Sequence, residues 1–120
     1  MLNEDAGILV RHDEIQTSAD VSTIPGLLLH SGDQYAKPGA FKFKRNGHWI
    51  DVSTDEFILR VEELFFALRS LGLQPGDRVA IVSETRLEWA IADYATLFAG
   101  GVTVPIYPTL SAAEIEFLLR

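Results

Sequence analysis

Residues 76–120, GDRVAIVSETRLEWAIADYATLFAGGVTVPIYPTLSAAEIEFLLR, decide the fold of this chain. Residues 78–83 are a short run rich in Val and Ile, which is typical of a strand buried on both faces of a sheet. Residues 86–99 predict a helix that is apolar on almost every side and needs cover on more than one face. Residues 102–107 predict a second apolar strand. Two such strands joined by a crossover helix indicate a right-handed, parallel βαβ unit.

Glycine and capping residues mark where the elements of this stretch end and begin. Gly100 and Gly101 end the helix predicted over residues 86–99, because glycine adopts the left-handed cap conformation without steric cost. Ser111 and Glu114 predict a capping box, in which each side chain accepts a backbone N–H at the start of the next helix. The inward stripe expected there consists of Ile115, Leu118 and Leu119. No glycine cap or strand follows, which favours truncation, although Arg120 is also electrostatically favourable at a helix C-terminus.

Composition limits the classes of function. The chain has 120 residues and 48% hydrophobic content, which predict one small globular domain with a core. Its net charge of −7 argues against nucleic-acid binding, because no basic stripe is available for phosphates. Cysteine is absent, which excludes disulfides and thiol chemistry. With no visible signal peptide or membrane span, the sequence predicts a cytoplasmic protein.

The domain organisation expected is an N-terminal arm, 1–21, followed by an incomplete subdomain, 22–120. The arm shows no apolar period, although Ile8, Leu9 and Val10 could add a short strand to a sheet edge.

Residues 22–37 predict the first helix. Ser22 or Thr23 can cap it, and Pro25 fits its first turn, where a missing N–H costs nothing. Gly32 is expected to weaken its middle. The residues expected to face inward are Ile24, Leu27, Leu28 and Tyr35.

Residues 40–53 predict a β-hairpin, because Asn46-Gly47 is the preferred pair for a two-residue type I′ turn. The register that this turn sets pairs Arg45 with His48, Lys44 with Trp49, Phe43 with Ile50, Lys42 with Asp51, and Phe41 with Val52. The Phe43/Ile50 and Phe41/Val52 pairs then form an apolar face. Trp49 falls on the polar face, where covering the lysine stems is favoured over a binding role.

Residues 53–71 predict the longest helix, which Ser53 and Glu56 start as a capping box and Gly72 ends. Glu56 and Arg60 are expected to pair on its outer face. The stripe at helical spacing consists of Phe57, Ile58, Val61, Leu64, Phe65, Leu68 and Leu71, and it is interpreted as core.

The turn at residues 83–89 is the candidate for function, since ligands gather at the carboxyl ends of parallel strands. Thr85 and Glu88 predict a further capping box there. Arg86 could bind an anion, but pairing with Glu84 or Glu88 is favoured, because one arginine among several acids is usually paired. No glycine-rich phosphate loop is present.

Other polar residues give weaker indications. Asp93 lies in an apolar helix and needs a partner if it is buried, so a satisfied structural carboxylate is favoured. His12, His30 and His48 have no partner at metal-ligand spacing, and no serine lies in a nucleophile elbow.

Three segments together resemble the N-terminal part of the ATP-dependent acyl-adenylate-forming ligases: GDRVAI (76–81), Glu88-Trp89 and AGGVTVPIYP (99–108). Tyr107-Pro108-Thr109 most resembles the long-chain fatty-acyl-CoA synthetase branch. The resemblance runs from about Ile24 to the last residue. It departs from the family at Thr85 and Leu87, where the family commonly has Asn and Pro.

The resemblance implies a function for an intact protein of which this chain is the opening segment. Such ligases use ATP and Mg²⁺ to activate a fatty acid as an acyl-adenylate and pass the acyl group to coenzyme A. The phosphate loop, adenine and ribose motifs and catalytic lysine of the family lie downstream. No catalytic, cofactor-binding or metal-binding residue is therefore assigned to this chain, and the chain alone is expected to be inactive and to bind none of these molecules.

The fold class expected is α/β: a partial three-layer βαβ subdomain of an adenylate-forming ligase N-terminal domain, preceded by a helix and a β-hairpin. Its expected partners are the fatty acid, CoA and the rest of the ligase chain. Unpaired sheet edges also predict a homodimer of the isolated chain. Alternatives left open are a non-catalytic module that pairs through its apolar sheet edge, a small flavodoxin-like domain, and peripheral attachment to a membrane.

Overall fold

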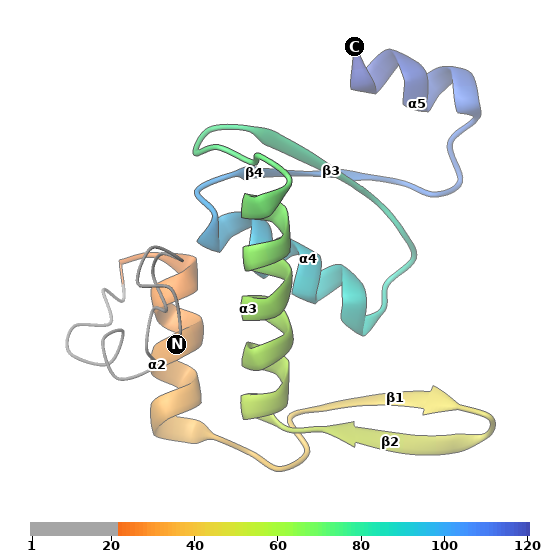
Figure 1. Ribbon diagram of the computed structural model, residues 1–120. Coiled ribbons are helices and arrows are strands. Elements are labelled where there is room, and N and C mark those ends of the chain that lie inside the picture. The colour runs from red at the N-terminus through yellow and green to blue at the C-terminus, as the bar shows by residue number, and fades with distance from the viewer. Residues whose placement is uncertain (1–21) are drawn as a thin grey trace, which may run out of the picture.

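The computed structural model describes residues 22–120 and shows a chain of mixed helices and strands (Figure 1). Its elements are α2 (Ile24–Tyr35), β1 (Phe41–Arg45), β2 (His48–Val52), α3 (Thr54–Ser70), β3 (Arg78–Val82), α4 (Leu87–Phe98), β4 (Val102–Ile106) and α5 (Ala112–Leu119). The α/β class is confirmed, and each predicted element of this part is present. The predicted arm, 1–21, with its strand at residues 8–10, lies outside the described residues.

The β1–β2 hairpin has the predicted register throughout. Asn46 and Gly47 both have positive φ, 51° and 82°, as a type I′ turn requires. On the inner face, Val52 belongs to the core, Phe41 and Phe43 pack against it, and Ile50 is half-buried. The turn pair therefore determined which side of the hairpin is apolar.

The outer face of the hairpin is polar and solvent-exposed. Lys42 Nζ lies 2.7 Å from Asp51 Oδ1, so the predicted opposite-charge pair is present. Trp49 is 68% exposed, and Lys44 Nζ lies 5.8 Å from the centroid of its ring. This contact supports the interpretation that Trp49 packs with the lysines of this face.

The core lies where α3, α4 and the hairpin meet. Phe57 of α3 is fully buried, stacks on Phe41 of β1 with ring centroids 4.3 Å apart, and meets Tyr94 of α4 edge-on at 5.8 Å. The buried cluster consists of Val52, Phe57, Val61, Ile91 and Ala95. Full burial of such large apolar side chains stabilises a fold by about 1.5–3 kcal/mol each. The contacts among these three aromatic rings thus join β1, α3 and α4.

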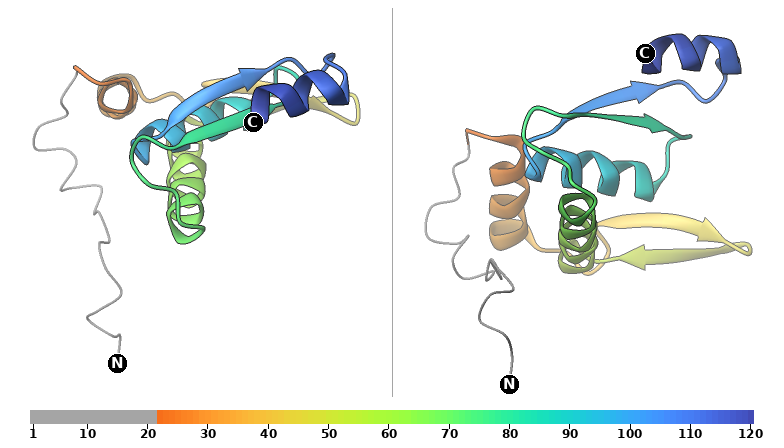
Figure 2. Two further views of the ribbon diagram at one scale, coloured as in Figure 1. Left: turned by 90° about the horizontal axis from the view of Figure 1, so that it is seen from above. Right: turned by 45° about the horizontal axis from the view of Figure 1, so that its top comes forward.

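β3 and β4 are parallel neighbours, and α4 connects them and packs on one face of the pair. Ile81 and Ile106 are buried, whereas Val82 and Val102 are 45% and 49% exposed. The prediction that both faces of the strands are buried is therefore wrong for this part of the chain. The reason is that α2, α3 and α4 all stand on one side of the strands (Figure 2).

α2 faces the core with a different side than predicted. Ile24, Leu27 and Tyr35 are 58%, 52% and 69% exposed, and only Leu28 of the expected set packs on the core. The buried residues of α2 are instead Gly26 and Gly32. A Cβ at Gly32 would meet Ile58 of α3, so the missing side chain of Gly32 lets α2 approach α3 closely.

Three other predicted inward positions are also exposed. Leu71, at the end of α3, is 85% exposed. In α5 no residue is buried, and Leu118 and Leu119 are 52% and 60% exposed. α5 stands apart from the helices of the core, beyond the end of β4 (Figures 1 and 2), so none of these helices covers its apolar side.

Within residues 22–120, no helix combines the length and the apolar character that crossing a membrane requires.

Candidate functional site

The carboxyl ends of β3 and β4 lie at the same edge of the sheet, because Val82 is opposite Ile106 in the parallel register. After β3 the chain turns through residues 83–86 into α4, and after β4 it turns through residues 107–110 before α5. A hollow of about 440 Å³ lies between these turns. In an open α/β sheet this is the place where ligands bind, so the hollow is the candidate site.

The hollow offers aromatic faces and hydroxyl groups. Its walls include Trp89 of α4 and Tyr107, and Tyr107 is 78% exposed. Ser83, also in the wall, donates from Oγ to the carbonyl of Glu84 at 2.9 Å. None of the described side chains that line this hollow is basic. The surroundings therefore suit an apolar or aromatic group better than a phosphate.

A second hollow, of about 630 Å³, lies between β1 and the start of α4. It combines apolar side chains such as Phe43 and Leu87 with the cationic residues Lys44, Arg45 and Arg86. The guanidinium carbon of Arg45 lies 5.3 Å from the centroid of the Phe43 ring. The two hollows share the turn after β3, so residues 84–85 border both.

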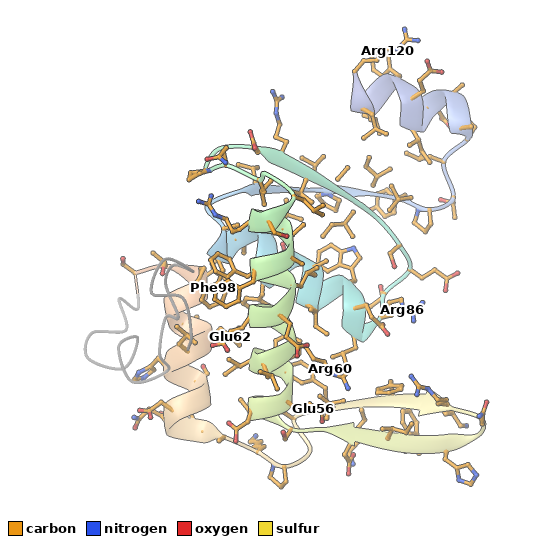
Figure 3. All side chains as sticks on the ribbon, in the orientation of Figure 1. Glu56, Arg60, Glu62, Arg86, Phe98 and Arg120 are labelled. Carbon is orange, nitrogen blue, oxygen red and sulfur yellow. The ribbon has the colours of Figure 1, made fainter. Side chains whose placement is uncertain are left out.

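Arg86, the residue that could have bound an anion, lies at the start of α4 (Figure 3) and is paired within its own turn. Its Nε donates to Glu88 Oε2 at 2.7 Å. This hydrogen bond lowers the pKa of Glu88 and raises the pKa of Arg86, and the charge of Arg60 on α3 lowers the pKa of Glu88 further. The favoured structural interpretation of Arg86 is therefore confirmed.

The predicted capping box of Thr85 and Glu88 is wrong. Arg86 holds the N-cap position of α4 and makes no side-chain capping hydrogen bond. Glu88 is engaged with the Arg86 guanidinium instead, and this places α4 one residue later than a Thr85 cap requires. By contrast, the Ser111–Glu114 box is complete. The predicted Ser53–Glu56 box is only partly correct: Ser53 accepts the backbone N–H of Glu56, but the Glu56 carboxylate pairs with Arg60 instead of closing the box.

Within residues 22–120, the structure brings no ion-pair or metal-ligating partner to the other polar candidates, Asp93, His30 and His48. Asp93 is half-buried, and among residues 22–120 no hydrogen bond or ion pair holds its carboxylate, so the expected satisfied carboxylate is not found. His30 and His48 join no group of three metal-ligating side chains in the described range. His12 lies outside it. The donor set present here does not fit Mg²⁺ or a nucleoside triphosphate by itself.

Sequence reasoning did not assign Trp89 and Tyr107 to a hollow. The available signal was Tyr107 placed directly after a strand, at the edge where the neighbouring strand also ends. Lys44 and Arg45 were likewise predicted only as polar hairpin residues. Their position beside the start of α4 depends on packing between segments that are far apart in the chain.

Comparison with known proteins finds clear likenesses. The AMP-binding enzyme family matches residues 30–120. Long-chain-fatty-acid--CoA ligase FadD15 of Mycobacterium bovis is 48% identical over 75 residues, which are 62% of this chain and 12% of that protein. The crystal structure of IdnL1 has a TM-score of 0.76 at 26% identity, covering 82% of this chain and 20% of its own. A Mycobacterium tuberculosis fatty acyl CoA synthetase has a TM-score of 0.56 at 28% identity, with 58% and 14% covered.

The chain thus spans only a small part of the proteins it matches, 12% of FadD15 by length.

Proposed function

Since the chain belongs to the AMP-binding enzyme family, we propose that it is the N-terminal segment of an ATP-dependent, AMP-forming ligase that converts long-chain fatty acids to acyl-CoA. The observation that carries this proposal is the 48% identity to a long-chain-fatty-acid--CoA ligase, FadD15. The intact enzyme would use ATP with Mg²⁺ to form an acyl-adenylate and then transfer the acyl group to coenzyme A. Its ATP and CoA requirements favour a cytoplasmic location.

Within such an enzyme, residues 22–120 act as a scaffold that is completed by the rest of the chain. Arg86 is paired with Glu88, and the hollow at the strand ends lacks basic side chains in the described range. These features support the expectation that the 120-residue chain alone is inactive and that the reacting groups come from elsewhere in the enzyme.

An assay of product formation tests this proposal. The full protein that contains this segment is incubated with ATP, Mg²⁺, CoA and either a long-chain fatty acid or acetate. We expect AMP and acyl-CoA in equal amounts with the long-chain acid, much less with acetate, and neither product from the 120-residue chain alone. ADP as the product, or a preference for acetate, would contradict the proposal.

A non-catalytic interaction module is the second candidate, and the exposed apolar residues favour it. Val82 and Val102 on the outer face of the sheet and Phe117 on α5 are 45%, 49% and 78% exposed. Such surfaces also suit contact with the remainder of a ligase. An adenylation domain encoded in frame directly after this segment separates the two candidates in favour of the ligase.

A further inference from the structure

α2 leaves an apolar stripe uncovered at the rim of the described structure (Figures 1 and 2). Ile24, Leu27 and Tyr35 are each more than half exposed. With the half-buried Ser31 they follow one another at intervals of three or four residues, so they share one side of the helix. We refer to these four residues as the α2 stripe. None of them is charged, which suits an apolar partner.

Glycines on another side of α2 prevent the helix from burying this stripe by itself. Gly26 and Gly32 are the buried residues of α2, and Gly32 packs against Ile58 of α3 without room for a Cβ. If α2 rotated about its axis, a larger side chain would enter the space that Gly32 now leaves to Ile58. A cover for the α2 stripe must therefore come from outside α2, α3 and α4.

The sequence before α2 contains one apolar segment that fits this surface. Residues 8–10, Ile-Leu-Val, are the only three consecutive large apolar residues in positions 1–21. Residues 11–23 separate Val10 from Ile24, and an extended chain of that length spans roughly 45 Å. The twelve residues of α2 make a helix about 18 Å long. Residues 8–10 can consequently reach every part of the α2 stripe, even when the connecting chain doubles back.

Two observations favour this segment over other partners. Residues 8–10 are tethered to the stripe, and a tether of this length corresponds to an effective concentration of about millimolar. A second copy of the chain competes on equal terms only when the protein itself is that concentrated. In addition, Ile24 and Leu27 precede residue 30, where the match to the AMP-binding enzyme family begins. The stripe thus begins outside the part of the chain that the family shares, which favours a partner peculiar to this chain.

We propose that residues 8–10 dock on the α2 stripe of the same chain and bury Ile24, Leu27 and Tyr35. The proposal assigns this apolar segment to a helix face and not to the sheet edge considered from the sequence. In this arrangement the N-terminal segment shields α2 from contact with other copies of the protein. The proposal rests on the stripe and on the sequence of this chain, and it is independent of the proposed enzymatic function.

Amide hydrogen exchange in the full protein tests the cover over α2. Ile8→Ser/Leu9→Ser/Val10→Ser should speed exchange in α2 about tenfold, the change expected when apolar side chains of this size lose roughly half of their burial. The matched control, Gln16→Ser/Thr17→Ser, changes polar residues of the same N-terminal segment and should exchange like the wild type. Equal exchange of α2 in the wild type and the triple variant, or an equal rise in the control, overturns the proposal.

A disulfide between engineered cysteines tests the contact itself in the full protein. After mild oxidation and digestion, mass spectrometry should find residue 9 linked to residue 27 in Leu9→Cys/Leu27→Cys. The control, Leu9→Cys/Leu118→Cys, uses a site on α5 that is 52% exposed, as Leu27 is, and should give at least about tenfold less product, because it lacks the docked contact. Comparable yields from the two pairs overturn the proposal.

An isotope mixture shows whether the two linked residues belong to one chain. Leu9→Cys/Leu27→Cys protein labelled with a heavy nitrogen isotope is mixed with unlabelled protein before oxidation. We expect linked peptides that are wholly heavy or wholly light. Linked peptides of mixed isotope content would assign the α2 stripe to a second copy of the chain and would overturn the proposal.

Discussion

Arg86 shows how near neighbours decide what a charged residue can do. Its position at the end of a parallel strand suits an anion ligand, but Glu88 lies two residues away and accepts its hydrogen bond at 2.7 Å. The sequence already contained this answer, because both charges lie in one short turn. The sequence wrongly indicated Thr85 as the cap of α4, because the cap depends on which of two local hydrogen bonds Glu88 makes.

Gly32 shows the opposite case, in which the partner of a residue is distant in the sequence. A glycine in mid-helix was expected only to weaken α2. In the structure, a Cβ added at Gly32 would lie 2.5 Å from Cδ1 of Ile58 on α3. The absence of a side chain therefore permits close contact between two helices, and no local pattern in the sequence could show this.

We expect Gly32→Ala to lower the free energy of unfolding by about 1–3 kcal/mol, because overpacking displaces the buried Ile58 side chain. This outcome is opposite in sign to the gain of about 1 kcal/mol that alanine brings to an unconstrained helix. In an Ile58→Val background, which lacks Cδ1, the same substitution should cost clearly less. Urea unfolding of the four proteins of this double-mutant cycle measures the difference. An equal cost of Gly32→Ala in both backgrounds would show that the two residues do not interact.

At the scale of elements, local chemistry was enough for some predictions and not for others. The Asn46-Gly47 pair fixed the hairpin register, and the capping residues fixed the starts of α3 and α5. The inward faces of α2 and α5 were predicted wrongly, because an apolar period shows only that a face exists. Whether another element covers that face depends on the tertiary arrangement.

α5 should respond to pH through its cap. Glu114 accepts hydrogen bonds from the Ser111 hydroxyl and backbone N–H at 2.7 and 2.8 Å, and these lower its pKa below the usual 4.5. A lowered pKa in the folded state means that the stabilisation is complete above pH 4.5 and is lost as the pH falls through the lowered value. With no buried residue in α5, we expect this helix to fray below pH 4.5 before α3 does.

Amide hydrogen exchange at residues 112–119 measures this fraying. Glu114→Gln should weaken protection at neutral pH and remove its acid dependence. Glu116→Gln, which removes the partner of Arg120 but keeps the capping box, serves as the control and should retain the acid transition. Persistent protection of α5 well below pH 4.5 in the wild type would contradict the assignment to the cap.

At the scale of the whole molecule, the exposed apolar residues predict association of the 120-residue chain. The outer face of the β3–β4 pair and the apolar side of α5 have no cover within residues 22–120, and α5 stands apart from the core (Figure 1). We expect the chain alone to form dimers or larger species in analytical ultracentrifugation. Phe117→Ser/Leu118→Ser should shift the distribution toward monomer, because the two changes remove exposed apolar area without touching the core. A stable wild-type monomer at high concentration would contradict this prediction.

The central claim is that this segment is scaffold in an ATP-dependent ligase and has no nucleotide site of its own. The most direct test is an ATP·Mg²⁺ titration of the melting temperature, carried out on the 120-residue chain and on the full protein side by side. A ligand that binds only the folded state raises the melting temperature by mass action. We predict a rise for the full protein, with a further rise on adding a fatty acid, and no change for the short chain. A rise for the short chain alone would make the turn at residues 83–89 a nucleotide site in its own right and would contradict the claim.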